Sequence, residues 1–208
     1  MKLTVFGATG PIGQQLVSQA VDRGHELTAA VESTASESRF RSSVETIEVD
    51  AYAGENVEAA VADTAAVCTV FQHTKSTPPD YIAVSGRHVL DAMESAAVER
   101  YLTVVPATVG RDGEQRGLVE SAGCLLLRLL RPTVVADAAD HADDVTSRDL
   151  DWTVVRPLRV GEGPTTRQYK TGTIKPGLAS VSYGDLSSFL LDCYERGIYL
   201  RMLPKIRT

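Results

Sequence analysis

The first residues of the chain hold a strand, a glycine turn and a helix, which strongly limits the folds available to it. Leu3–Phe6 is a short apolar run that predicts a buried strand, and it ends at Gly7. Pro11 follows as a favourable first helical residue, because a proline lacks the N–H that would be unpaired there. From Ile12 apolar residues recur at helical spacing as far as Gly24. These elements form the first half of a βαβ unit.

The turn between this strand and helix carries three glycines, Gly7, Gly10 and Gly13, in the pattern G-x-x-G-x-x-G. Glycines let the backbone approach a ligand closely, and the free N–H groups at the start of a helix attract negative charge. The turn is therefore predicted to bind the pyrophosphate of a dinucleotide. The residues assigned to this contact are Gly7, Ala8, Thr9, Gly10, Pro11, Ile12 and Gly13.

Strand and helix patterns alternate along the rest of the chain. Strands are expected at 26–31, 44–49, 66–71, 101–105 and 152–155, and helices at 55–63, 81–98 and 137–148. This alternation predicts an α/β fold, a doubly wound parallel sheet of the Rossmann type with right-handed crossovers. Loops rich in Ser, Thr, Gly and Pro are expected at 33–43, 72–80, 106–117 and 159–180. Several of them follow the carboxyl ends of strands, where open α/β sheets bind ligands.

The composition is typical of a single enzyme-sized domain, residues 1–208, and excludes other classes. A formal net charge of −6 argues against nucleic acid or an anionic membrane as a partner, because both attract basic surfaces. The apolar runs are too short to span a membrane. Cys68, Cys124 and Cys193 show no C-x-x-C spacing, so no zinc site or disulfide framework is indicated. We expect a cytoplasmic protein with reduced thiols and no bound metal.

Glu32 ends the second expected strand and lies about 20 residues beyond Gly13. At this spacing a carboxylate meets the adenosine ribose of NAD, and it would repel the 2′-phosphate of NADP. Arg39 and Arg41 follow within a few residues and could hold that phosphate instead. The expected cofactor is therefore NAD or NADP, with NAD favoured.

Sequence motifs at both ends of the chain resemble known reductases. Gly-Ala-Thr-Gly-x-x-Gly at 7–13 resembles the short-chain dehydrogenase/reductase superfamily, particularly its extended and atypical branches. Asp-Trp-Thr-Val-Val-Arg-Pro at 151–157 is similar to a signature of the NAD(P)-binding, NmrA-like atypical reductases. Residues 161–169 and the Ser-x-x-Asp-Leu segment at 182–186 resemble the biliverdin-IXβ reductase (flavin reductase) family. Arg156, within the signature, is interpreted either as a site residue or as an internally paired one.

This resemblance implies where ligands would bind. Asp50 and Ala51, after the third expected strand, would lie beside the adenine, although Asp50 could equally cap the following turn. Phe71 and Gln72 end the fourth expected strand, near the place of the nicotinamide ribose. Residues 159–180 would form a small C-terminal lobe that faces the substrate.

The sequence departs from the family in its catalytic residues. Classical members use Tyr-x-x-x-Lys for proton transfer, and no tyrosine here precedes a lysine at that spacing. Atypical reductases place Ser or Thr beyond the fifth strand, where this chain has Pro106, so Thr108 is the nearest candidate. The flavin reductases carry an Asp-His pair before the sixth strand, which Asp140 and His141 match in type. His141 is thus the second catalytic candidate, and the alternative is a surface histidine on a charged helix face.

Because the sequence lacks a clear proton donor, it favours an acceptor that is easily reduced. Hydride transfer to a flavin or a quinone needs chiefly proximity and orientation, since water can supply the proton. The acceptor pocket is expected between the loops 72–79, 106–113 and 159–175. The last of these loops carries the candidate substrate residues Arg167, Tyr169 and Lys170, which are suited to stacking on or pairing with a planar anionic ring.

Three functions compete on this reading of the sequence. The first is an NAD(P)H-dependent oxidoreductase of the flavin or biliverdin reductase type. The second is a non-catalytic, NmrA-like sensor of nicotinamide dinucleotides, which Pro106 and the missing Tyr-x-x-x-Lys favour. The third, a nucleotide-sugar epimerase or dehydratase, is disfavoured because 208 residues leave little for a substrate domain. In each case we expect a monomer or a small homo-oligomer.

Overall fold

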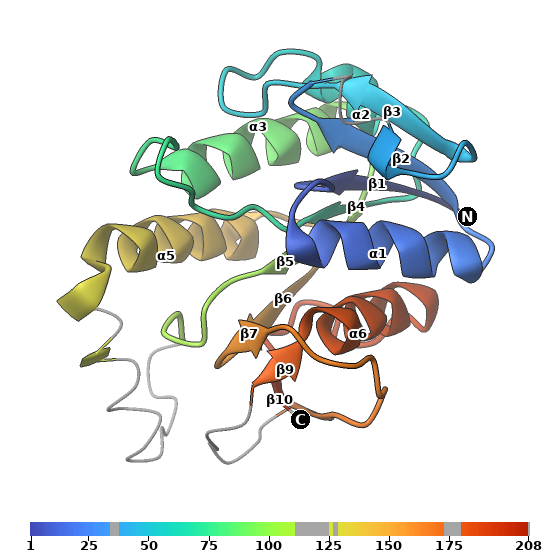
Figure 1. Ribbon diagram of the computed structural model, residues 1–208. Coiled ribbons are helices and arrows are strands. Elements are labelled where there is room, and N and C mark those ends of the chain that lie inside the picture. Colours follow the sequence, from blue (N-terminus) through green and yellow to red (C-terminus); the bar gives the residue numbers. More distant parts are fainter. Residues whose placement is uncertain (34–37, 111–124, 127–128, 173–179, 208) are drawn as a thin grey trace.

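An eight-stranded sheet forms the centre of the protein (Figure 1). The computed structural model describes residues 1–33, 38–110, 125–126, 129–172 and 180–207. The strand order is β3-β2-β1-β4-β5-β6-β10-β8, and all neighbours are parallel except β8 and β10. The strands are β1 (Lys2–Phe6), β2 (Glu26–Val31), β3 (Val44–Glu48), β4 (Ala66–Thr69), β5 (Arg100–Val104), β6 (Asp151–Pro157), β8 (Lys170–Gly172) and β10 (Lys205–Arg207). A separate parallel pair joins β7 (Val160–Gly161) to β9 (Val181–Ser182).

Helices cover both faces of this sheet, as the alternation of elements predicts (Figure 1). On one face α1 and α6 lie side by side and bury Leu16 and Leu190 in one core cluster. On the other face α2, α3 and α5 bury Leu90 and Val145 in a second cluster. The helices are α1 (Pro11–Asp22), α2 (Val57–Val61), α3 (Tyr81–Ser95), α5 (Pro132–Ser147) and α6 (Tyr183–Glu195). The predicted doubly wound α/β fold is confirmed.

The strand order reverses between β1 and β4, next to the glycine turn. The chain builds β1, β2 and β3 in one direction and then crosses to the other side of β1 to form β4, β5 and β6. Loops that leave the carboxyl ends of β1 and β4 therefore diverge, and ligands of open α/β sheets bind at such a point.

The sixth strand is longer than the sequence pattern predicts, because an unpredicted strand extends its pairing. Beyond β5, the end of β6 pairs with β10 through Lys205 opposite Arg156. The Arg156 side chain donates to Val109 O at 2.8 Å and to Leu203 O at 3.0 Å, and it is buried. The internally paired interpretation of Arg156 is therefore confirmed.

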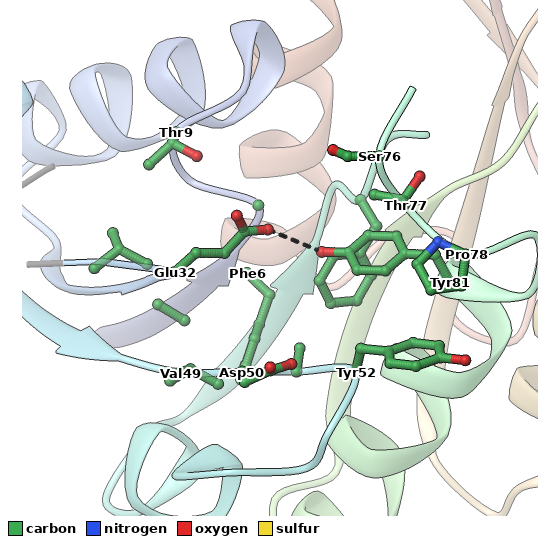
Figure 2. A pocket seen from close by; sticks show the side chains of 15 residues that line it. Phe6, Thr9, Glu32, Val49, Asp50, Tyr52, Ser76, Thr77, Pro78 and Tyr81 are labelled. Atoms are coloured by element: carbon green, nitrogen blue, oxygen red, sulfur yellow. Dashed lines mark hydrogen bonds between the residues drawn. The ribbon is translucent and has the colours of Figure 1, made fainter. Parts of the chain in front are cut away.

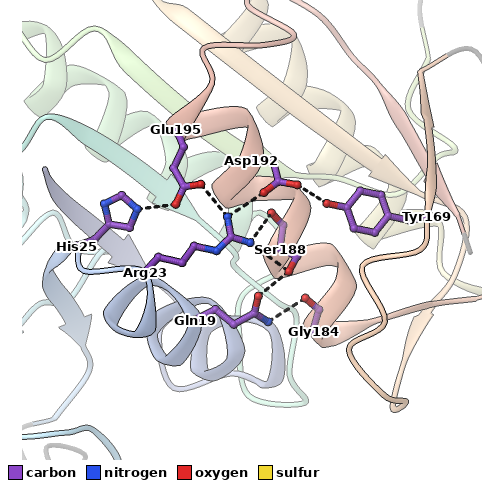
Figure 3. A network of polar contacts seen from close by, with 8 residues as sticks. All are labelled: Gln19, Arg23, His25, Tyr169, Gly184, Ser188, Asp192 and Glu195. Carbon is purple, nitrogen blue, oxygen red and sulfur yellow. Dashed lines mark hydrogen bonds and ion pairs between the residues drawn. The ribbon is translucent and has the colours of Figure 1, made fainter.

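A polar network joins α1 to α6 (Figure 3). Arg23 donates from Nη1 to Asp192 Oδ1 at 2.8 Å and to Glu195 Oε2 at 2.9 Å, and its side chain is only 14% exposed. His25 Nε2 lies 2.8 Å from the same Glu195. The Tyr169 hydroxyl donates to Asp192 Oδ2 at 2.5 Å. The network thus ties the helix of the glycine turn to the last large helix.

Replacing Arg23 with glutamine is expected to lower the free energy of unfolding by about 1–3 kcal/mol, because hydrogen bonds to charged groups contribute about 1.5–3 kcal/mol. Urea denaturation would measure the change. The matched control is Arg41→Gln, whose pair with Asp22 joins side chains that are 58% and 54% exposed. An exposed pair contributes less than about 1 kcal/mol. Equal losses in the two variants would contradict a stabilising role for Arg23.

Candidate functional site

The glycine turn is shaped by two different demands. Gly7 has a φ of 75°, and a Cβ there would lie 2.7 Å from Val70 O. A Cβ on Gly13 would lie 2.2 Å from Gly7 O. Close packing of the chain therefore accounts for both of these glycines. Gly10 differs: its φ is −74°, and a Cβ would keep an ordinary 3.4 Å from Gly7 O.

The fold therefore has room for a side chain at Gly10. The need to bind a ligand explains the glycine at this position better than packing within the chain does. Gly10 is the N-cap residue of α1, whose first turn presents backbone N–H groups that lack partners within the helix. Gly10 N itself donates to Gly7 O at 3.1 Å and closes the turn. A bare backbone at the start of a helix suits a pyrophosphate, so the residues present fit a dinucleotide.

A cavity of about 340 Å³ opens beside this turn (Figure 2). We call it the glycine-turn cavity. It lies at the carboxyl ends of β1, β2 and β3 and beside the loop after β4. Of the predicted cofactor residues, it is lined by Gly7, Thr9, Glu32, Asp50, Ala51 and Phe71. The structure thus brings together residues that the sequence assigned to the cofactor from four separate segments.

Glu32 meets a tyrosine that the sequence interpretation missed. The Tyr81 hydroxyl, at the start of α3, donates to Glu32 Oε1 at 3.4 Å across the cavity (Figure 2). Burial, and then the charge of Glu32, raises the pKa of Tyr81 to about 12, so the phenol keeps its proton at neutral pH. Tyr52 lines the same cavity, with its ring stacked on that of Tyr81 at a centroid distance of 6.2 Å. A tyrosine at the first position of a helix gives no sequence signal for this contact.

The glycine-turn cavity is acidic. Glu32 and Asp50 are the charged residues among the described side chains that line it. Arg39 is exposed and is not among the lining residues, and Arg41 pairs with Asp22 at 2.6 Å. The cavity wall therefore offers no described cation to a 2′-phosphate.

Asp50 caps a turn and lines the cavity, and its place beside the adenine stays a prediction. Its Oδ1 accepts a hydrogen bond from Ala53 N at 2.9 Å, so it caps the turn that follows β3. The side chain is exposed and also lines the cavity.

A second cavity of about 290 Å³ lies at the carboxyl ends of β4, β5 and β6. We call it the strand-end cavity. Three residues of the predicted cofactor set, Ile12, Phe71 and Gln72, line it together with Pro106, Arg131 and Arg159. Phe71 lines both cavities, so the two meet at this side chain. A ligand that extends from the glycine turn past Phe71 would reach the strand-end cavity.

The predicted substrate residues lie away from both cavities. Asp185, buried in α6, accepts hydrogen bonds from the backbone N–H groups of Thr166 and Arg167, both at 2.7 Å. These bonds draw the segment onto α6, where the Tyr169 ring packs edge-on against Phe189. Arg167 is exposed, and Lys170 is exposed at the start of the edge strand β8. Residues 173–179, the rest of the predicted lobe, lie outside the described residues.

The two predicted catalytic residues also line neither of these two cavities. Thr108 is 3% exposed and is not among the lining residues. His141 is fully buried, with Nε2 3.2 Å from both the Tyr101 hydroxyl and Thr103 Oγ1. Burial lowers the pKa of His141 to about 4, so the ring is neutral at neutral pH. The preceding Asp140 is exposed, whereas His141 is in the core, so the alternative of a surface histidine is wrong.

A different acid–histidine pair faces the strand-end cavity. His73 lines it, and His73 Nε2 lies 2.6 Å from Asp137 Oδ2. Asp137 is one helical turn before His141 on α5, and His73 lies in the loop after β4. The two partners are 64 positions apart in sequence, so no local motif could have indicated the pair.

The described cysteines take no part in either cavity. Cys68 and Cys193 are buried, and burial raises the pKa of each thiol to about 12. Cys124 lies outside the described residues. Within the part of the chain that the structure describes, no cluster of His, Cys, Asp and Glu could hold a metal ion. In the same part, no helix is both long and apolar enough to cross a membrane.

Comparison with known proteins identifies the class. The model of the NAD(P)H-binding family matches residues 7–196, so the chain belongs to that family. Its cofactor is accordingly NAD or NADP, in agreement with the fit of the glycine turn.

Solved structures share the fold over the whole chain. The oxidoreductase YlbE from Lactococcus lactis is similar with a TM-score of 0.81 and 14% identity, over 100% of this chain and 91% of that chain. A wide-type short-chain dehydrogenase/reductase from Veillonella parvula, solved in complex with NADP, gives a TM-score of 0.81 and 16% identity, over 100% and 94% of the two chains. These likenesses show the shared fold, which is the fold that the resemblance to atypical short-chain dehydrogenases/reductases implies.

Proposed function

We propose that the protein is an NAD(P)H-dependent oxidoreductase that passes a hydride to a planar conjugated acceptor such as a flavin or a quinone. The observation that carries this proposal is the meeting of the two cavities at Phe71. The glycine-turn cavity fits the adenosine and pyrophosphate part of the cofactor, and the strand-end cavity has room for an acceptor. When bound, the reduced nicotinamide supplies the hydride.

The chain's own residues would bind and orient the two reactants. The backbone at Gly10 would hold the pyrophosphate, and Glu32 would accept hydrogen bonds from the ribose hydroxyls. Phe71, at the junction, would separate the two cavities and orient what lies on either side. The apolar residues Val70, Val104 and Val105 line the strand-end cavity and would exclude water from the acceptor.

We further propose that NADH is preferred over NADPH. Both charged residues on the described wall of the glycine-turn cavity are carboxylates, and they would repel a 2′-phosphate. Glu32, at the end of β2, is the one placed at the expected distance from the glycine turn.

Exchanging Glu32 for arginine is expected to reverse this preference. One charged hydrogen bond contributes about 1.5–3 kcal/mol, which corresponds to about a 10- to 100-fold change in Kd. Fluorescence titrations with NADH and NADPH would measure both affinities. The matched control is Glu26→Arg, which makes the same charge change at the exposed opposite end of β2. Tighter binding of NADPH than of NADH by the wild type would contradict the preference.

A turnover assay separates the enzyme from a sensor. The wild type is expected to oxidise NADH steadily when FMN or a soluble quinone is added, as followed by the absorbance of NADH. The sensor hypothesis is supported by Pro106, which lines the strand-end cavity where related reductases place a hydroxyl. NADH binding without turnover of any acceptor would favour the sensor and contradict the enzyme.

A further inference from the structure

The His73–Asp137 pair at the strand-end cavity is held in place by burial and by backbone hydrogen bonds. The Asp137 side chain is 1% exposed and that of His73 is 11% exposed. Asp137 Oδ1 accepts a hydrogen bond from Ala83 N at 2.8 Å, and Oδ2 accepts one from Ile82 N at 2.9 Å. Because both carboxylate oxygens are held by the first turn of α3, Oδ2 has a fixed position toward His73. The short contact of 2.6 Å assigns a proton to Nε2 of the histidine.

The other ring nitrogen, Nδ1, faces a hydroxyl that suits both protonation states. Thr77 Oγ1 lies 3.3 Å from His73 Nδ1 and 3.2 Å from Thr74 O. When Nδ1 carries a proton, it can donate to Thr77 Oγ1 while the Thr77 hydroxyl donates to Thr74 O. When Nδ1 has lost its proton, the same hydroxyl can turn and donate to Nδ1. Nδ1 therefore keeps a hydrogen-bond partner both before and after it releases a proton, while Thr74 O, on an exposed residue, can turn to water.

The position of the pair connects it to both cavities. His73 lines the strand-end cavity, whereas Thr77 lines the glycine-turn cavity. The Tyr81 ring lies edge-on to His73 with a centroid distance of 6.5 Å, and edge-on to Phe71 with one of 5.7 Å. The imidazole therefore lies beside the junction at which a hydride would pass between two bound molecules.

We propose that His73, aligned by Asp137, supplies the proton that the sequence alone would leave to water, for an acceptor whose oxygen must be protonated as it is reduced; this step rests on the proposed function. A quinone or another ring carbonyl accepts a hydride and becomes an oxyanion, and the oxyanion takes the proton from His73 Nδ1. The hydride would come from the reduced nicotinamide, where a C–H bond breaks, and it forms a C–H or O–H bond on the acceptor. One O–H bond forms with the proton, while the N–H bond of His73 breaks. The imidazole is left neutral, with Nε2–H still on Asp137, and solvent reprotonates it.

The charges that line the strand-end cavity also suit an acceptor whose oxygen becomes negatively charged during reduction. Among the described residues, those that line it and carry a charge besides His73 are Arg131 and Arg159, both cationic. Guanidinium groups stabilise developing negative charge on an acceptor oxygen. The proposed acceptor class is therefore narrower than planar rings in general: it is a conjugated carbonyl compound, with a quinone as the simplest member.

The test compares two acceptors in His73→Gln. A quinone needs a hydride and a proton, whereas the cationic dye methylene blue becomes neutral by accepting a hydride alone. General acid catalysis contributes about 10²–10⁴-fold, so the variant is expected to reduce a soluble quinone at least about 100-fold more slowly. Its reduction of methylene blue should change less than about 3-fold, and its Kd for NADH should stay the same. A merely structural loss would slow both acceptors equally.

The matched control is His25→Gln. His25 is also a partly buried histidine paired with a carboxylate, with a 7% exposed side chain and Glu195 at 2.8 Å. It lies beside α1 and α6 and lines neither cavity. This variant is expected to reduce both acceptors at the wild-type rate. If His73→Gln also keeps the wild-type rate with the quinone, the proton-donor role is wrong although the proposed function stands. A wild type that reduces no acceptor overturns the proposed function and this role together.

A second measurement on the wild type does not depend on turnover or on the stability of a variant. Long-range ¹H–¹⁵N spectra distinguish the two neutral tautomers of a histidine. Neutral His73 is expected to carry its proton on Nε2, where Asp137 holds it, and to leave Nδ1 free to accept a proton. A neutral ring with the proton on Nδ1 would overturn the proposal, because no proton could then be taken up and released there.

Discussion

Replacing Gly10 with valine is expected to weaken NADH binding at least about 100-fold while the protein stays folded. The backbone at Gly10 has an ordinary φ of −74°, and a Cβ would lie 3.4 Å from Gly7 O, so the chain can hold a side chain there. The valine methyl groups would stand where a pyrophosphate approaches the start of α1. Losing two charge-assisted hydrogen bonds, at about 1.5–3 kcal/mol each, accounts for a change of this size.

Two other glycines show whether the effect is specific. Gly13→Val is expected to disrupt folding, because a Cβ at Gly13 would lie 2.2 Å from Gly7 O. Gly161→Val is the matched control, since a Cβ there meets nothing within 4 Å and Gly161 lines neither cavity. Circular dichroism would verify folding and fluorescence titration would give the Kd. A folded Gly10→Val protein with wild-type affinity would refute the assignment of the pyrophosphate site.

The glycine turn could be predicted because its chemistry is local. A buried strand, a proline at the first helical position and three glycines follow one another within the first 13 residues, and each constrains its neighbours. The spacing from the turn to Glu32 could also be predicted, because one helix of ordinary length separates β1 from β2. These signals predicted Gly7, Thr9 and Glu32 on the wall of the glycine-turn cavity.

The strand-end cavity could not be predicted to the same extent, because its residues meet only through the sheet. His73 comes from the loop after β4 and Asp137 from α5. The helix α5 also carries His141, so the sequence offers Asp137 and Asp140 as acids and His141 as the nearest histidine. The sequence favoured Asp140 and His141 as neighbours in the chain. In the structure the helix turns Asp137 toward the loop after β4 and turns His141 into the core. Periodicity indicates that such a face is buried but not which partner each residue meets.

The substrate residues predicted in the C-terminal lobe line neither cavity, although Arg159 and Val160 of the same lobe line the strand-end cavity. Aromatic and basic residues in a loop suggest a ligand. In the structure, however, Thr166 N donates to Asp185 and the Tyr169 hydroxyl donates to Asp192, both on α6. Short strands such as β8 and β10 have three residues each, and their pairing depends on the end of β6. A pattern of three residues carries too little periodicity to predict either strand.

The wild type is expected to lose about 3 kcal/mol of stability between neutral pH and about pH 4 through His141 alone. Burial lowers the pKa of His141 from 6.5 to about 4 in the folded protein. Each pKa unit corresponds to about 1.4 kcal/mol. Between these two values the unfolded chain binds the proton and the folded chain does not, so stability falls as the pH falls. The loss begins as the pH drops through 6.5 and is complete below about 4.

His141→Gln is the variant that isolates this contribution. The amide of glutamine has donors and an acceptor for Tyr101 and Thr103 but no proton to gain in this range. Carboxylates lower the stability of both proteins in acid, and that common loss cancels in the difference between them. Urea denaturation at a series of pH values should show the variant losing about 3 kcal/mol less than the wild type toward pH 4. Parallel curves would contradict a neutral, buried His141, and an imidazole that titrates near its ordinary pKa in NMR spectra would do so independently.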